Sequence, residues 1–434
     1  MRCVSPQYHR SVMLTRVLCF LSAGILLAQP AADPKDVARK ALDLLLAQKY
    51  PDLVQLLTPE AKTAYSEAAL AKNGAEIASW GTVATIGDPS VRKMVGASIV
   101  AIPVKFATQS ITFSFSVTDE GLVSGMVHSP ADPWQHPPYS KPDSFQGREI
   151  TIGEGQWKLP GTLSVPTGQG PFPGVVLVHD SGPGNRDETV GAVKVFKDLA
   201  EGLASRGVVV LRYEKRTRQY PAIITTKDYT VEQETMEDAG LAAALLRTQP
   251  EVKPGRVFLL GYGLGGYVAP RIAEADGKLA GIIIVDANAR PLEDVALDLA
   301  QYLGVTGPQL AVIKESAAKI KALTAADEDA PPLLGMRGPY LLDLKDYNPA
   351  GQAKLLGIPM LILQGERDFQ VTMKDFNLWK SGLQGQRTVT FKSYPALDHV
   401  LVAGQGKSME ADYRKPGQHV AQDVVDDVAK WVSQ

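Results

Sequence analysis

Three short segments of the chain carry residues that could act together in catalysis. The first is VFLLGYGLGGYVAP at 257–270, an apolar run followed by a glycine-rich turn and a helical pattern. It has the spacing of G-x-S-x-G, a turn that presents a nucleophilic serine, but Gly263 stands at the centre. Asp368 follows the strand pattern IPMLILQG, and His399 follows the strand pattern of 388–395. Nucleophile position, acid and histidine therefore occur in an order that suits covalent acyl transfer.

Each signal is common by itself, and the glycine turn also has another interpretation. The spacing from Gly261 to Gly266 matches G-x-G-x-x-G, which would indicate a dinucleotide site if no other signal existed. Asp368 alone would more often cap a helix or form a turn. A dinucleotide site explains neither Asp368 nor His399, and the glycine turn lies in mid-chain rather than after the first strand. The combined pattern favours the catalytic interpretation.

A polar, glycine-rich loop precedes this turn in the sequence. The strand pattern VVLVH runs into HDSGPGNRDE, at a position where a backbone N–H can contribute to an oxyanion hole. His179 at the strand end is interpreted as a residue that stabilises the loop. No metal or cofactor is expected, since H-x-x-x-H spacing is missing among the later histidines His128, His136, His179, His399 and His419.

Composition narrows the function classes. The chain has 434 residues, 45% of them hydrophobic and 21% charged, which is ordinary for a globular protein. A formal net charge of -2 argues against broad attraction to nucleic acids or anionic membranes. A small-molecule substrate or ligand is the better expectation, and the sequence leaves the oligomeric state open.

The first thirty residues have the pattern of a signal peptide. Arginines precede the apolar run 17–28, which is too short to span a bilayer, although a membrane anchor or a buried helix remains the alternative. Translation could start at Met1 or Met13. Both cysteines, Cys3 and Cys19, lie in this segment, so the mature chain would contain no thiol. We expect a periplasmic or extracellular protein without a membrane span in its mature form.

Two domains are expected after the signal peptide. Residues 31–130 combine helical spacing with three alternating strand patterns and predict a small α+β domain. A proline-rich linker follows at 131–147. From 148 to 434, near-continuous apolar strands alternate with helices, which indicates a mostly parallel sheet covered by helices on both faces. Residues 291–346 interrupt this rhythm with charged helical sequence and read as a cap insertion.

These stretches also resemble a known family. GPFPGVVLVHDSGPGNRDE, LLGYGLGGYVAPRIA, PMLILQGERDFQVTMKDFNLW and SYPALDHVLVAGQG are similar to bacterial α/β-hydrolases of the dienelactone-hydrolase and serine-peptidase-like type. The segment before them resembles the DUF3887 domain. The resemblance implies an α/β-hydrolase fold and an ester, amide or thioester hydrolase by descent. It also implies that Asp368 and His399 are triad partners and that N–H groups at Ser181 and Leu264 form the oxyanion hole.

The chain differs from the family pattern in the nucleophile motif and in the motif that contributes to the oxyanion hole. The family reads HGSGP and GHSLGG, whereas this chain has Asp180 in the first motif and Tyr262 and Gly263 in the second. Glycine supplies no oxygen for an acyl-enzyme, so turnover is expected to be weak or absent. Four outcomes stay open: water activated by His399, Ser181 as an alternative nucleophile, a pseudoenzyme that binds a ligand in the same cleft, or an altered residue at position 263 in an ordinary hydrolase.

Overall fold

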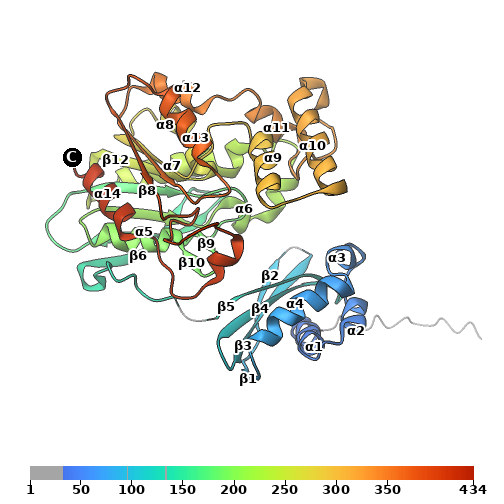
Figure 1. The fold of residues 1–434 in the computed structure, drawn as a ribbon. Coiled ribbons are helices and arrows are strands. Elements are labelled where there is room, and N and C mark those ends of the chain that lie inside the picture. Colours follow the sequence, from blue (N-terminus) through green and yellow to red (C-terminus); the bar gives the residue numbers. More distant parts are fainter. Residues whose placement is uncertain (1–32, 95, 132–133) are drawn as a thin grey trace, which may run out of the picture.

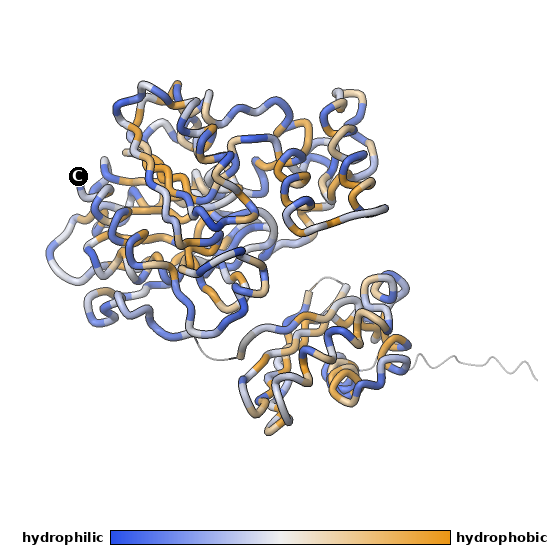
Figure 2. The backbone as a smooth tube through the Cα atoms, in the orientation of Figure 1, coloured by the Kyte–Doolittle hydropathy of each residue, from blue (hydrophilic) through white to orange (hydrophobic). Residues whose placement is uncertain are grey.

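The computed structural model describes residues 33–94, 96–131 and 134–434 (Figure 1). The predicted signal peptide at 1–30 lies outside these residues. Every helix in the described part of the chain is too short or too polar to cross a membrane. A smaller α+β unit precedes a larger α/β unit along the chain, and both have apolar interiors, seen as orange segments in Figure 2.

The α+β unit packs helices on one face of an antiparallel sheet. In strand β4 every second side chain is buried, including Phe113 and Phe115, as the alternating sequence predicts. The sheet order is β1-β3-β4-β5, and β2 also pairs with β3. The elements are α1 (Pro34–Leu46), α2 (Tyr50–Gln55), α3 (Pro59–Ala64), α4 (Glu67–Ser79), β1 (Val83–Ile86), β2 (Ser90–Met94), β3 (Ala97–Phe106), β4 (Ser110–Thr118) and β5 (Val123–Pro130).

The structure contains more elements in this unit than the sequence pattern indicated. Helices α3 and α4 are capped by Thr58 and Ser66, whose side chains accept hydrogen bonds from the backbone N–H three residues later. Such N-caps stabilise the start of a helix. Strands β1 and β2 are largely exposed, so their sequences lack a hydrophobic alternation.

The α/β unit is built on an eight-stranded sheet in the order β15-β14-β13-β12-β8-β11-β7-β6. Six neighbouring strands, from β15 to β11, are parallel, while β7 pairs antiparallel with β11 and β6 pairs antiparallel with β7. The sheet begins earlier than the expected boundary at 148. Its strands are β6 (Phe145–Ile152), β7 (Leu159–Pro166), β8 (Phe172–Val178), β11 (Val209–Tyr213), β12 (Val252–Tyr262), β13 (Gly281–Val285), β14 (Met360–Gly365) and β15 (Val389–Tyr394), and a small separate hairpin is formed by β9 (Thr189–Val190) and β10 (Val193–Lys194).

Helices cover both faces of this sheet, as predicted. One apolar cluster joins the sheet to α5 (Val195–Ala204) and α14 (Gln422–Val432). The other joins the opposite face to α7 (Glu237–Arg247), α8 (Leu264–Asp276), α12 (Pro349–Leu356) and α13 (Met373–Gly382). Strand β13 is buried along its whole length, because side chains on both faces of a covered parallel strand enter the core.

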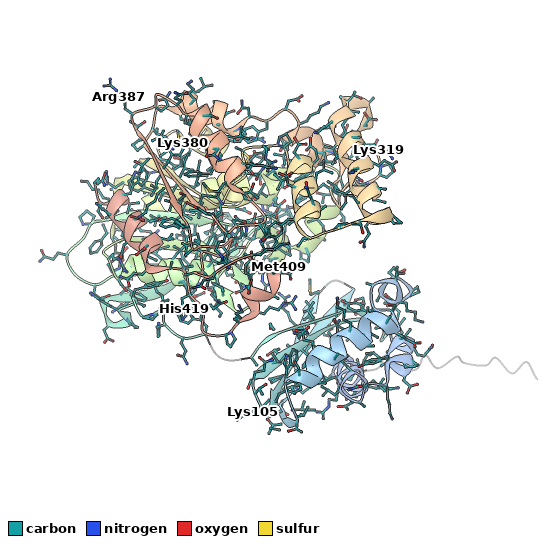
Figure 3. The ribbon with its side chains drawn as sticks, in the orientation of Figure 1. Lys105, Lys319, Lys380, Arg387, Met409 and His419 are labelled. Atoms are coloured by element: carbon teal, nitrogen blue, oxygen red, sulfur yellow. The ribbon has the colours of Figure 1, made fainter. Side chains whose placement is uncertain are left out.

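The charged segment after β13 folds as helices beside the ends of the strands (Figure 1). Its helices are α9 (Leu292–Tyr302), α10 (Gly307–Ala322) and α11 (Gly338–Leu344). Figure 3 shows Lys319 of α10 on the outer side of this group, where a charged side chain stays in water. The inner residues of the group are therefore the ones available to a site at the strand ends.

Candidate active site

The glycine-rich turn adopts the sharp reversal expected from its sequence. Strand β12 ends at Tyr262, helix α8 starts at Leu264, and Gly263 between them has φ 52° and ψ -116°. This backbone conformation is strained for a residue with a side chain. At Gly265 a Cβ would collide with the backbone of β8, so close packing of the helix against the neighbouring strand requires glycine there.

The acid and the histidine meet beside this turn. Asp368 lies after β14, and its Oδ2 is 2.7 Å from Nδ1 of His399. The other oxygen of Asp368 accepts the N–H groups of Gln370 and Val371 at 2.8 and 3.0 Å, which holds the carboxylate in place. Tyr262 Oη donates to the carbonyl of His399 at 2.7 Å, and the two rings lie 5.0 Å apart. The strand end thus positions the imidazole directly.

The carboxylate of Asp180 lies where a serine side chain would begin. A Cβ built on Gly263 would overlap the Oδ1 atom of Asp180. That Oδ1 accepts the N–H groups of Ser181 and Leu264, each at 2.7 Å. The Oδ2 atom is 3.5 Å from Nε2 of His399. One carboxylate therefore contacts both expected oxyanion-hole donors and the catalytic face of the imidazole.

The two neighbouring carboxylates change the charge state of the imidazole. Burial alone would lower the pKa of His399, but the charges of Asp368 and Asp180 outweigh it and hold this pKa well above its ordinary value. Burial would raise the pKa of Asp180, but the hydrogen bond and charge of His399 and the two N–H donors hold it below its ordinary value. These two directions favour an imidazolium that faces a carboxylate.

A buried ion pair braces the loop that carries Asp180. Nζ of Lys215 donates to the Asp180 carbonyl and to Oε1 of Glu234, each at 2.6 Å. The same Oε1 accepts the Gly182 N–H at 3.0 Å, and Tyr229 donates to Oε2 at 2.9 Å. The side chains of Lys215 and Glu234 are 2% and 5% exposed, so water competes little for these bonds. The loop is held from behind by charge-assisted hydrogen bonds.

Two further buried acids lie close to the site and were not singled out from the sequence. Asp286 follows β13, and its pKa is raised well above the ordinary value by burial and by the charge of Asp368. Burial, followed by the charge of Asp180, raises the pKa of Glu188 to about 8. Both residues favour the protonated form when folded, because they are buried and the site already contains two carboxylates.

Asp286, Asp368 and His399 also place possible metal-ligand atoms within 4.8 Å of one another. Asp286 Oδ1 accepts the Gly365 N–H at 2.7 Å, and the facing atoms of Asp368 and His399 bond each other. These contacts already employ most of the ligand atoms in hydrogen bonding. The cluster fits a histidine held by carboxylates better than a metal centre.

A cavity of about 960 Å³ opens above the turn and includes Asp180, Gly263 and Leu264 in its lining. The cap segment supplies apolar walls through Leu292, Ala296, Leu299, Leu334, Met336 and Tyr340. The α+β unit also reaches it, through Arg92, Met94 and Ile99 of β2 and β3. This volume lies within the usual range of small-molecule sites.

The structure brings together every residue that the sequence pattern assigned to the site: Gly263, Asp368, His399, Ser181 and Leu264. Their arrangement differs from the expectation at one point. The N–H groups of Ser181 and Leu264 already bond the carboxylate of Asp180, a residue noted in the sequence only as a departure from a glycine. The sequence signal that points to Asp180 is a combination of two differences from the family motifs. Gly263 removes the serine side chain, and Asp180 adds a carboxylate.

His179 also lies close to the site but takes no part in the reacting contacts. It is buried at the end of β8, with Nε2 3.1 Å from the Asn185 carbonyl. Burial and the charge of Lys215 lower the pKa of this histidine to about 3, so it is neutral. It fits the predicted role of stabilising the loop.

The sheet order, the reversal after β12 and the acid and histidine after β14 and β15 define an α/β hydrolase. Residues 159–298 match the model of the dienelactone hydrolase family. The chain is 40% identical over 333 residues to Esterase EstD from Thermotoga maritima, an alignment that covers 76% of this chain and 78% of EstD. The chain therefore belongs to the esterase family of EstD.

Solved structures with a similar fold include two esterases. Est1E from Butyrivibrio proteoclasticus is 15% identical, with a TM-score of 0.43 over 66% of this chain and 96% of its own. The esterase domain of a Rhodothermus marinus protein is 17% identical, with a TM-score of 0.41 over 66% of this chain and 97% of its own.

Proposed function

We propose that this esterase-family protein binds a small, largely apolar ester-like ligand in its cavity and has weak or no turnover by the serine mechanism. The observation that carries the proposal is the carboxylate of Asp180 on the N–H groups of Ser181 and Leu264. A substrate carbonyl needs these donors to stabilise its developing oxyanion. An ionised carboxylate bound there repels that charge and occupies its position.

The missing serine adds to this obstacle. Removal of the catalytic serine from a serine protease such as subtilisin lowers kcat by about 10⁶-fold. That factor corresponds to about 8 kcal/mol of transition-state stabilisation. Hydrogen bonds from an intact oxyanion hole would leave some catalysis, but in this chain those donors are already engaged. Efficient acyl transfer therefore lacks both the nucleophilic serine and a free oxyanion hole.

Direct attack by water is the first alternative, with His399 as the general base. A base must be able to accept a proton, and the charges of Asp368 and Asp180 raise the pKa of His399, which favours its protonated form. Its Nε2 also faces Asp180 at 3.5 Å rather than open space. Ser181 is the second alternative, but its backbone N–H is bonded to Asp180 and its side chain is exposed. The contacts of Asp180 with His399 and with the Ser181 N–H thus count against both routes of ester hydrolysis, and they favour ligand binding without turnover.

The test is an esterase assay of the purified protein with p-nitrophenyl acetate and longer acyl esters. We expect rates close to the blank, no labelling by a fluorophosphonate probe, and no further loss in His399→Ala. Fast hydrolysis that disappears in His399→Ala would contradict the proposal. Quenching of tryptophan fluorescence by a non-hydrolysable ketone analogue of the ester would measure binding separately, and Asp423→Asn on the exposed part of α14 is the matched control.

We also propose that the protein is exported, because the apolar run at 17–28 follows arginines and is shorter than a membrane span. Expression of the full chain in a bacterial host and N-terminal sequencing of the periplasmic fraction test this. An uncleaved chain in the cytosol would contradict it.

A further inference from the structure

The two oxygens of the Asp180 carboxylate have different surroundings. Oδ1 is fixed by the N–H groups of Ser181 and Leu264, whereas Oδ2 faces His399 at 3.5 Å. The side chain is 27% exposed and belongs to the cavity lining, so a bound molecule can reach it. The carboxylate has the position, the access and the negative charge of a nucleophile.

The chemistry of a carboxylate decides which carbon it can attack usefully. Attack on an ester carbonyl would give an anhydride, which is less stable than the ester it replaces. Attack on an sp³ carbon with a good leaving group gives an alkyl ester on the enzyme, as carboxylate nucleophiles do elsewhere. We propose that Asp180 is a catalytic nucleophile that displaces an anionic leaving group from an alkyl or benzylic carbon, an activity beyond the proposed ligand binding.

We take an alkyl halide as the substrate of this class. In the first step Oδ2 of Asp180 forms a bond to the carbon, and the carbon–halogen bond breaks with its electron pair on the departing halide. The product is an alkyl ester of Asp180 whose carbonyl oxygen, Oδ1, is already bonded to the N–H groups of Ser181 and Leu264. These two donors are then in the correct place to stabilise an oxyanion on Oδ1. The oxyanion hole would therefore stabilise the hydrolysis of the covalent Asp180 ester.

The second step hydrolyses that ester. His399 releases its proton to solvent, a water molecule attacks Cγ of Asp180, and Nε2 of His399 takes the proton from the water. The tetrahedral intermediate collapses, the alkoxide leaves with a proton from His399, and the new carboxyl returns its own proton to His399. The sum is alkyl halide plus water to alcohol, halide and one proton, with the enzyme restored.

Alkylation itself prepares His399 to act as a base. The imidazole contacts the carboxylates of Asp368 and Asp180. Asp286 also lies close to it, but its raised pKa favours the uncharged, protonated form. Ester formation removes the charge of Asp180 and leaves Asp368 as the charged partner. Burial lowers the pKa of His399, and one charged carboxylate opposes this effect less than two do. The imidazole therefore loses its proton more readily. The base becomes available only when the covalent intermediate exists.

The charges of the cavity fit an anionic leaving group. Its lining includes the cations Arg92 and Arg337, together with Arg218, which pairs with Glu214 at 3.2 Å. The acids in the lining are Asp180 and Glu234, the latter paired with Lys215. The remaining walls are largely apolar and come from the cap and from Pro221, Ile224 and Tyr229. An apolar alkyl group would therefore lie against the walls while the departing anion meets positive charge.

Bromohexane is a suitable probe, since it is apolar, has a primary carbon and releases bromide. In wild-type protein we expect formation of hexanol and bromide in equal amounts. In Asp180→Asn we expect a loss of about 10⁶-fold, the size of the effect of removing the nucleophile of a serine protease. In His399→Gln we expect the protein to gain the mass of one hexyl group, and peptide mapping to locate it on Asp180.

The matched control is Asp423→Asn, which also removes one aspartate charge but lies on the exposed surface of α14. It is expected to keep the wild-type rate. Equal hexanol formation in wild-type and Asp180→Asn protein would overturn the proposal. So would a hexyl group on other carboxylates of His399→Gln with none on Asp180.

Isotope labelling separates the covalent route from direct displacement by water. With enzyme in excess in water enriched in ¹⁸O, the first turnover should give unlabelled hexanol, because its oxygen comes from Asp180. Repeated turnovers should place the heavy oxygen in the peptide that contains Asp180. Labelled hexanol in the first turnover, with an unlabelled peptide, would overturn the proposal. These readouts are independent of ester hydrolysis, so each proposal can fail without the other.

Discussion

The site has two halves that differ in how closely they follow the serine-hydrolase pattern. In the acid–base half, Asp368 and His399 make the 2.7 Å contact that this chemistry requires. In the nucleophile half, defined here as Asp180, Gly263 and Leu264, the serine is missing and a carboxylate from the neighbouring loop fills its position. The comparison teaches that a lost side chain need not leave a space, because an adjacent loop can supply a different functional group to the same donors.

The largest expected effect comes from exchanging both residues of the nucleophile half. Asp180→Gly together with Gly263→Ser should free the oxyanion donors and restore a serine beside His399, with esterase activity about 10⁴-fold or more above wild type. Gly263→Ser alone should stay inactive, because its Cβ would overlap the Asp180 carboxylate. The measurements are p-nitrophenyl acetate hydrolysis and fluorophosphonate labelling. Equal activity in the single and double variants would contradict the overlap.

The acid–base half can be broken by removing its carboxylate. The side chains of Asp368 and His399 are 0% and 4% exposed, so the pair is buried. Asp368→Ala should lower the free energy of unfolding by about 3–5 kcal/mol, the usual cost of leaving one member of a buried pair without its partner. Denaturant unfolding at neutral pH measures this, with Asp423→Asn as the control. A change below about 1 kcal/mol, the size of a surface pair, would mean that the pair contributes little.

The pH dependence of stability should report the acid behind Asp180. The folded chain keeps the Glu188 proton up to a pKa of about 8, whereas the unfolded chain loses it near the ordinary value of 4.5. The folded state then binds more protons in this window, so the free energy of unfolding falls as pH rises through it. The slope from this group is about 1.4 kcal/mol per pH unit. Glu188→Gln should remove that slope, and parallel curves for variant and wild type would argue against it.

The smallest expected effect concerns the support of the imidazole. Tyr262 Oη donates to the His399 carbonyl at 2.7 Å, and both groups are buried. Tyr262→Phe should lower the free energy of unfolding by about 1 kcal/mol, the typical value of one hydrogen bond. Thermal unfolding checks this. A loss as large as that of Asp368→Ala would show that the two halves are coupled more strongly than their contacts indicate.

Much of the fold could be predicted from local pattern. Near-continuous apolar strands separated by helices indicated the covered sheet, and charged helical sequence at 291–346 indicated the helices α9, α10 and α11. The exposed strands β1 and β2 escaped detection, because they pair with β3 without a buried apolar face that would give a hydrophobic period. The start of the sheet at Phe145 was missed for the same reason, since β6 is mostly exposed.

The sequence by itself determined that Gly263, Asp368 and His399 follow strands of one parallel sheet, and therefore that they lie at the same edge. Only the tertiary structure decided that Asp180 reaches the donors beside Gly263, because that contact joins loops 84 residues apart and depends on the spacing of β8 and β12. The charge of His399 was decided in the same way. Its pKa follows from burial and from two carboxylates that only folding brings to the imidazole.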